Sequence, residues 1–105
     1  MGVRACRVVF RAAQHYEATM LHVERVEAPT EVPSKTFVPD HGILGSGANL
    51  RTIARRFVAL CPSWSVVLVD LRGHGASPVG QGPHTLAACA ADLEELSAGL
   101  AHPVR

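Results

Sequence analysis

The order of hydrophobic and polar residues predicts three strands. Residues 20–28 alternate loosely between apolar and charged side chains, a pattern typical of an edge strand with one solvated face. Residues 36–38 begin a second strand, and Pro39 interrupts it because proline has no N–H group to donate to a sheet. Residues 65–70 contain a run of aliphatic residues without alternation. This run indicates an interior strand that other elements cover on both faces.

Two further segments repeat apolar residues at the spacing of an α-helix. The first helix follows a glycine-rich stretch at residues 41–48, with Ser46 or Asn49 as its predicted N-cap and Pro62 as its stop. The second helix begins near Thr85. The predicted apolar faces consist of Leu50, Ile53, Ala54, Phe57 and Val58 in the first helix, and of Leu86, Ala90, Leu93, Leu96 and Leu100 in the second.

The predicted elements follow one another as strand, strand, helix, strand and helix. This alternation predicts the α/β class, with a mostly parallel sheet and helices on its faces. A sheet of this kind needs another central strand after the last helix, whereas the sequence closes with Val104 and Arg105. We therefore expect a partial sheet with an unpaired edge, through which the chain could associate with itself.

Composition places the chain among globular proteins and argues against several functions. Hydrophobic residues make up 48% of the 105 residues, charged residues 18%, and the formal net charge is +1. Such a charge, without Lys- or Arg-rich runs, disfavours nucleic acid as a partner. No apolar run approaches the ~20 residues of a membrane span. The three cysteines and six histidines lack metal-ligand spacing, so we expect no metal site, no disulfide framework and no cofactor.

The first 19 residues are more basic than the rest of the chain. Arg4, Arg7 and Arg11 precede the first acidic residue, Glu17, and in a helix these arginines share one face. Two interpretations stay open: a transit peptide for a plastid or mitochondrion, or the frayed basic N-terminus of a cytoplasmic protein. In both interpretations, residues 20–105 form the domain.

Two loops carry the candidate chemistry, and each follows a predicted strand. They read His41-Gly42-Ile43-Leu44-Gly45-Ser46-Gly47 and Asp70-Leu71-Arg72-Gly73-His74-Gly75-Ala76-Ser77. In this order, with one helix and one strand between them, they resemble the α/β-hydrolase superfamily, in its branch of small esterase-like hydrolases. There an HG loop follows the third strand and a D-x-R-G-H-G-x-S loop the fourth. The resemblance covers residues 36–105, and the chain departs from it at Pro39-Asp40, where a carboxylate would be buried unless the strand frays.

The resemblance implies a role for each loop. Acyl transfer builds negative charge on a carbonyl oxygen, which preorganised backbone N–H groups stabilise. The N–H of Ile43 is implied as one donor of this oxyanion hole, and Gly42, which has no Cβ, shapes the loop for a close approach. Full-length members act on small-molecule ester or acyl substrates. The other motif residues are implied to be structural, with glycines suited to positive φ: His41, Asp70, Arg72, Gly73, His74 and Gly75.

The serine nucleophile of that family is missing from this sequence. The family presents it in a G-x-S-x-G turn between a strand and a helix. Ser46 lies between Gly45 and Gly47, and Ser77 precedes Pro78, so neither serine fits the pattern. The resemblance places the serine, the acid and the catalytic histidine after residue 105. We therefore expect the N-terminal part of a hydrolase domain, inactive by itself.

Two other classes of protein remain as alternatives. Gly45-Ser46-Gly47 before a helix and Asp70 after a strand are also parts of a dinucleotide-binding fold, in which a phosphate lies at the helix N-terminus and the acid binds a ribose. Its fingerprint requires Gly or Ala where Leu50 stands, and it leaves the RGHG loop unexplained. The chain could instead be a non-enzymatic truncated product that binds a partner through uncovered faces.

Overall fold

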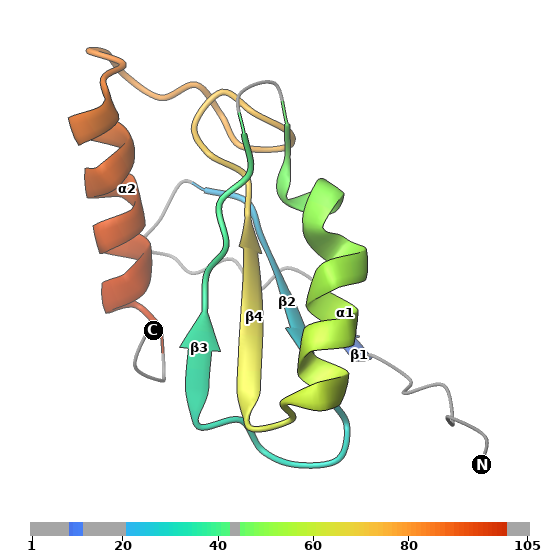
Figure 1. Cartoon of the computed structure of the whole chain (residues 1–105). Helices are drawn as coiled ribbons and strands as arrows, with labels where there is room; N and C mark the ends of the chain where they lie inside the picture. The colour runs from blue at the N-terminus through green and yellow to red at the C-terminus, as the bar shows by residue number, and fades with distance from the viewer. Residues whose placement is uncertain (1–8, 12–20, 43–44, 101–105) are drawn as a thin grey trace.

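The computed structural model describes residues 9–11, 21–42 and 45–100. These residues form a sheet between two helices (Figure 1). The strands pair in the order β1-β2-β4-β3. The elements are β1 (Val9–Arg11), β2 (Val23–Glu27), β3 (Lys35–Phe37), the 3-10 helix η1 (Gly47–Leu50), α1 (Arg51–Leu60), β4 (Trp64–Val69) and α2 (Leu86–Ala98).

The directions of the strands confirm the α/β class. β3 runs parallel to β4, whereas β2 runs antiparallel to both of its neighbours, β1 and β4. It follows that β1, β3 and β4 point one way and β2 alone points the other. A parallel neighbour requires a crossover connection, and η1 with α1 supplies it between β3 and β4.

β2 is an interior strand, so its prediction as an edge strand was wrong. β1 pairs along its outer side, with Phe10 opposite Val26. The polar residues that suggested a solvated face are only half-exposed because they pair with other charged groups: Glu24 with Arg51 of α1, and Glu27 with Arg25.

β1 falls inside the basic N-terminal segment. Val9–Arg11 is extended at these three residues and pairs antiparallel with β2. The rest of the predicted transit segment, at residues 1–8 and 12–19, lies outside the described residues.

β4 separates two hydrophobic cores, as expected of a strand covered on both faces. Its side chains alternate: Val66 and Leu68 belong to the core under α1, and Val67 and Val69 belong to the core under α2. All four are at most 2% exposed. The cores contain Val26, Ala28, Ala54, Val58, Val66 and Leu68 on the α1 side, and Leu21, Val23, Val67, Val69 and Leu96 on the α2 side.

The helices confirm the predicted positions but not all of the predicted contacts. In α1, Ala54 and Val58 are buried, whereas Ile53 is 68% exposed. In α2, Leu96 is buried and Leu86 at its start is 90% exposed.

The sheet also explains Pro39 and Asp40. β3 ends at Phe37, and Asp40 is exposed in the loop that follows. Because the strand stops early, the proline costs no sheet hydrogen bond and the carboxylate stays in water. Within the described residues, no helix is both long enough and apolar enough to cross a membrane.

Candidate functional site

The two glycine loops lie together at the carboxyl ends of β3 and β4, and His41 joins them. The backbone N–H of Leu71 donates a hydrogen bond to His41 Nε2 over 3.0 Å. His41 Nδ1 lies 2.8 Å from the carbonyl oxygen of Gly42. A carbonyl can only accept, so the proton is on Nδ1 and the ring is the neutral tautomer in this arrangement. His41, 8% exposed, therefore holds the HG loop against the loop after β4.

His74 stands next to His41 but is bound within its own loop. The two imidazole rings are tilted by 53°, with centroids 5.0 Å apart. His74 Nδ1 donates to the carbonyl oxygen of Arg72 over 3.0 Å. This bond fixes the ring as part of a tight turn, in which the N–H of His74 also donates to the carbonyl of Leu71.

Asp70 joins three segments of backbone, two through its carboxylate and one through its own N–H group. Oδ1 accepts from the N–H of Gly47 at the start of η1 over 2.7 Å, and Oδ2 accepts from the N–H of Ala76 over 2.9 Å. The backbone N–H of Asp70 donates to the carbonyl of His22, which precedes β2. Asp70 thus provides the cap predicted from Ser46 or Asn49; the side chain of Ser46 makes no capping bond. A carboxylate at this position also interacts favourably with the positive end of the helix dipole.

Ser77 is buried and its hydroxyl is fully engaged. It donates to the carbonyl oxygen of Asp70 and accepts from the backbone N–H of His22. A hydroxyl with these two partners closes the loop onto β2. Among the described residues, no histidine side chain pairs with this hydroxyl to remove its proton.

Gly75 permits the turn that places Asp70. Its φ is +50°, a region that side chains disfavour, and Gly73 has φ +71°. A Cβ on Gly75 would also overlap the Asp70 carboxylate, lying 2.6 Å from its Cγ. The turn therefore requires glycine at position 75 for both backbone conformation and space.

Arg72 attaches this loop to α2. Its Nε and Nη2 donate to the two carboxylate oxygens of Asp92 over 2.6 and 2.7 Å, and its Nη1 donates to the carbonyl of Gln81. The hydrogen bonds that the Arg72 guanidinium donates to Asp92 raise its pKa above the ordinary value. The forked geometry fixes both the distance and the orientation of the two groups.

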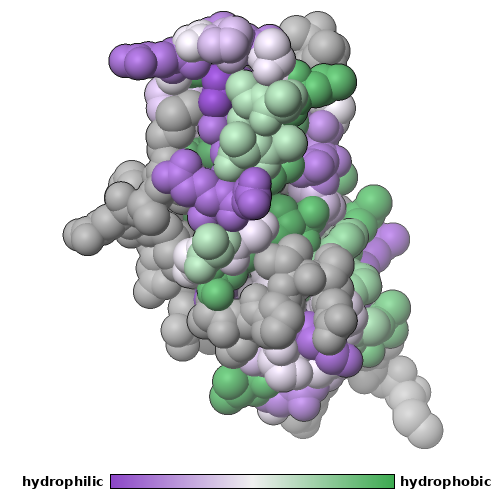
Figure 2. Space-filling view, turned by 90° about the vertical axis from the view of Figure 1, so that its left-hand side faces the viewer, coloured by the Kyte–Doolittle hydropathy of each residue, from purple (hydrophilic) through white to green (hydrophobic). Residues whose placement is uncertain are grey.

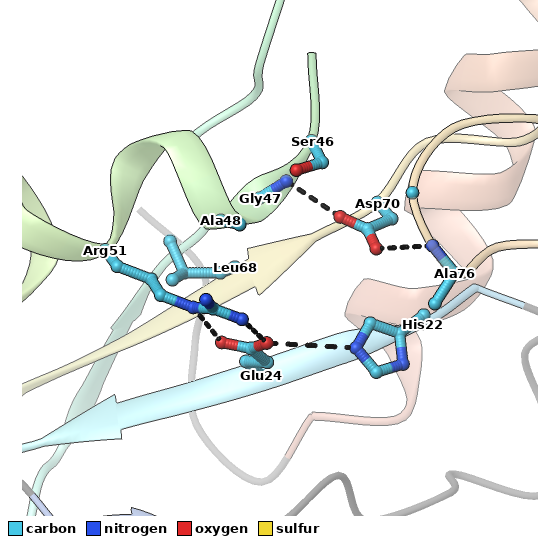
Figure 3. Close-up of a pocket in the computed structure, with 10 residues that line it drawn as sticks. His22, Glu24, Ser46, Gly47, Ala48, Arg51, Leu68, Asp70 and Ala76 are labelled. Carbon is cyan, nitrogen blue, oxygen red and sulfur yellow. Dashed lines mark hydrogen bonds and ion pairs between the residues drawn. The ribbon is translucent and has the colours of Figure 1, made fainter.

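A polar pocket of about 240 Å³ lies between the two loops and β2 (Figure 3). The guanidinium of Arg51 reaches from α1 to Glu24 on β2, with Nε 2.8 Å from Oε2. His22 Nε2 is 4.0 Å from the same carboxylate. The hydrogen bond from Arg51 holds the pKa of Glu24 below its ordinary value of 4.5, against the opposing effect of burial. Figure 3 shows Glu24 and Asp70 each directed to its own partners, so this arrangement ties α1 and the loops to the sheet.

A second pocket has a volume of about 380 Å³. Its lining is mostly apolar and comes from the two loops and the start of α2: Gly42, Leu71, Arg72, His74, Val79, His84, Thr85, Leu86 and Cys89. A Cβ on Gly42 would meet no atom within 4 Å. The space that a side chain at position 42 would fill is therefore open among the described atoms, and Gly42 lines this pocket.

Most of the predicted site residues lie within one rim of the sheet. His41, Gly42 and the motif residues at 70–75 are brought together, whereas Ile43, the implied oxyanion donor, lies outside the described residues.

The sequence analysis did not predict four polar residues that help to build this rim: His22, Glu24, Arg51 and Asp92. A signal existed for Asp92, the first acid of the predicted helix that follows the loop with Arg72. Glu24 and Arg51 are separated by 27 residues, and no pattern in the sequence pairs them. The described residues contain no cluster of three potential metal ligands.

Comparison with known proteins supports a hydrolase fold. No family model and no curated protein sequence matches the chain. Among solved structures, a marine microorganism esterase is 29% identical, with a TM-score of 0.59 over 74% of this chain. The haloalkane dehalogenases DatA from Agrobacterium tumefaciens C58 and DbeA from Bradyrhizobium elkani USDA94 are 23% and 21% identical, with TM-scores of 0.58 and 0.54 over 90% and 87% of it.

These neighbours are all α/β-hydrolase fold members. The chain therefore has the fold of part of an α/β-hydrolase, built around the strand order β1-β2-β4-β3 and the two loops after β3 and β4. It spans 27% to 30% of the length of the three neighbours. The dinucleotide alternative loses its support, since the Asp70 carboxylate is occupied by Gly47 and Ala76 and is not free for a ribose.

Proposed function

We propose that this chain is the part of an esterase-like α/β-hydrolase that carries the oxyanion loop, and that alone it does not hydrolyse esters. The observation that carries the proposal is the hydrogen bond between Leu71 N–H and His41 Nε2, 3.0 Å long. It brings an HG loop and a DxRGHG loop to one rim of the sheet. Neither loop alone is specific, and the two loops in this order, held together by buried His41, support the proposal.

In this proposal the HG loop stabilises developing negative charge on a substrate carbonyl. The N–H of Ile43 is the donor, and Gly42 presents the loop to the pocket of about 380 Å³. The apolar lining of that pocket, with Leu71, Val79 and Leu86, suits the acyl group of a small ester. The name of the marine esterase agrees with an ester as the substrate class.

The proposed inactivity follows from the engaged hydroxyl of Ser77 and from the sequence. No G-x-S-x-G occurs in the 105 residues. Ser77 is enclosed between Asp70 and His22, and His74 donates to Arg72 instead of facing a nucleophile. Half an oxyanion hole without a nucleophile and base leaves nothing to form an acyl intermediate.

The test is hydrolysis of p-nitrophenyl acetate by the purified chain. Free imidazole also attacks this ester, so the reference is the same chain at the same concentration unfolded in urea, with the urea effect on the buffer rate subtracted. We expect the folded chain to be no faster than the unfolded one. Folded-state turnover that persists in Ser46→Ala and Ser77→Ala but is lost in His74→Ala would contradict the assignment, because it would make His74 a catalytic base.

A further inference from the structure

The link between the two glycine loops depends on which ring atoms of His41 carry a proton. Nε2 has to accept, because its partner is the backbone N–H of Leu71, 3.0 Å away. Nδ1 has to donate, because its partner is the carbonyl oxygen of Gly42, 2.8 Å away. A neutral imidazole supplies one donor and one acceptor, whereas a protonated imidazole supplies two donors. Only the neutral ring therefore satisfies both partners of His41.

The surroundings of His41 hold the ring in this orientation. The carbonyl oxygen of Gly42 also accepts from the N–H of Gly45 over 3.0 Å, which fixes the acceptor that Nδ1 faces. A Cβ on Gly45 would lie only 3.4 Å from Nδ1, and His41 itself is 8% exposed. A proton added to Nε2 would therefore point at the N–H of Leu71. That N–H would lose its acceptor, which costs more than the hydrogen bond itself contributes.

The charged neighbours of His41 do not compensate for an added proton. The titratable and charged side chains at this rim are Asp40 on its own segment, Asp70, Arg72 and His74 on the loop after β4, His22 before β2, and His84 and Asp92 before and within α2. η1 adds none. The carboxylates of Asp70 and Asp92 already accept hydrogen bonds from other groups, and Asp40 is exposed to water. The positive charge of Arg72 opposes a second one on His41.

His74 provides a comparison within the same rim. Its ring centroid lies 5.0 Å from that of His41. Its Nδ1 donates to the carbonyl oxygen of Arg72 over 3.0 Å, and among the described residues nothing donates to its Nε2. Protonation of His74 therefore keeps its hydrogen bond, whereas protonation of His41 removes the bond to Leu71.

We propose that His41 ties residues 41–42 to the loop after β4 only while its ring is neutral, and that mild acid breaks this tie. Histidine side chains in general change charge between about pH 5 and 8. The tied form uses the Nε2 lone pair, so the released form binds the proton more readily. The tie therefore weakens as the pH falls, by up to about tenfold per pH unit for one proton. Hydrophilic side chains lie at the surface of this end of the molecule, at the top of Figure 2, where water supplies the proton.

This range of pH lies above that of Glu24, whose pKa is lowered from 4.5, so the two effects are separable. The geometry of His41 stands independently of the proposed function, and no substrate is needed to test it.

The first measurement is hydrogen exchange at the Leu71 amide, followed by NMR between about pH 7.5 and about pH 5. Its protection is the exchange rate of an unstructured peptide at the same pH divided by the observed rate. We expect this protection to fall with the pH while that of Val67, in the centre of β4, stays constant. Constant protection at Leu71 would overturn the proposal. Equal loss at Val67 would also overturn it, because acid would then open the whole sheet.

The ring nitrogen signals of His41 report its protonation directly and require no variant. At neutral pH the proton should be on Nδ1. Because the chemical shift of the Leu71 amide follows its hydrogen bond, we expect this shift to change with the same midpoint as the ring signals. A ring that takes up its proton while the Leu71 signal stays unchanged would contradict the tie.

Two matched variants assign the effect to one of the neighbouring rings. His41→Gln offers an amide oxygen near the position of Nε2 and does not titrate, so Leu71 should lose its pH dependence. His74→Gln makes the same change on the adjacent ring and should keep that dependence. The opposite pattern would assign the acid response to His74 and overturn the proposal. Circular dichroism checks that each variant is folded, and the ring signals of the natural chain decide the question if His41→Gln is not.

Discussion

Asp70 is the residue that organises the rim of the sheet. Its carboxylate accepts from the backbone of both glycine loops, at Gly47 and Ala76, and it is only 7% exposed. A buried N–H group that loses its acceptor costs more than the bond itself contributes. Position 70 therefore tolerates few substitutions, even though the residue has no catalytic role in the proposed function.

Asp70→Asn tests this role with almost no change in size. The amide can accept from only one of the two N–H groups and would point its own donor at the other. We expect a loss of about 1–3 kcal/mol in the free energy of unfolding, measured by urea denaturation. Asp40→Asn, at an exposed carboxylate in the preceding loop, should change it by less than about 0.5 kcal/mol. Equal losses would show that Asp70 does not join the loops.

Substitutions of Gly75 and Gly73 provide a second comparison at the scale of single residues. Both have positive φ, but a Cβ at Gly73 would meet its nearest atom at 3.8 Å, whereas a Cβ at Gly75 would overlap Asp70. Gly73→Ala should cost about 1 kcal/mol of backbone strain alone. Gly75→Ala should cost about 2 kcal/mol or more, since it adds steric overlap. The ranking by urea midpoint is the measurement, and the reverse order would contradict the geometry of the turn.

At the scale of elements, α2 depends on few contacts. Leu96, 1% exposed, is its one fully buried side chain among the described residues, and the Arg72–Asp92 ion pair ties the middle of the helix to the loop. α1, in contrast, continues from η1, which Asp70 caps, and is further held by Glu24. The helix beside the apolar pocket is thus the less firmly attached of the two.

Leu96→Ala should therefore destabilise the chain by about 2–5 kcal/mol, because it removes the apolar anchor of α2. Leu86→Ala lies in the same helix at a side chain that is 90% exposed, and should change the free energy of unfolding by less than about 0.5 kcal/mol. Chemical denaturation monitored at the single tryptophan, Trp64, reports both variants. A similar effect of the two would mean that α2 does not dock through Leu96.

At the scale of the whole molecule, ion pairs make stability depend on pH. The pKa of Glu24 is lowered in the folded state by the hydrogen bond from Arg51. A lowered folded pKa means that the unfolded chain binds the proton more readily, so the stabilisation is complete above pH 4.5 and is lost as the pH falls through the folded pKa. We expect the urea midpoint to fall on acidification below pH 4.5.

Glu24→Gln should reduce the steepness of that fall and lower stability at neutral pH. Glu31→Gln, at an exposed loop position, serves as the control and should keep the natural profile. A Glu24→Gln chain with an unchanged pH profile would show that this carboxylate does not contribute to acid unfolding.

The sequence alone determined the elements with strong local patterns. The aliphatic run within residues 65–70 predicted a strand covered on both faces, and both helices were predicted close to their observed bounds. The two loops, read in order, were sufficient for the fold family. The physical reason is that burial on both faces, helical period and glycine turns are local requirements, which neighbouring residues in the chain express directly.

Only the tertiary structure decided where β2 lies and which polar groups meet. The charged residues of β2 predicted a solvated face. In the structure Glu24 pairs with Arg51, Glu27 pairs with Arg25, and β1 lies along the outer side of the strand. The cap of η1 comes from Asp70, 23 residues after Gly47. Pairings of this kind join residues that are distant in sequence, and they depend on how the strands are ordered in the sheet, which no local period records.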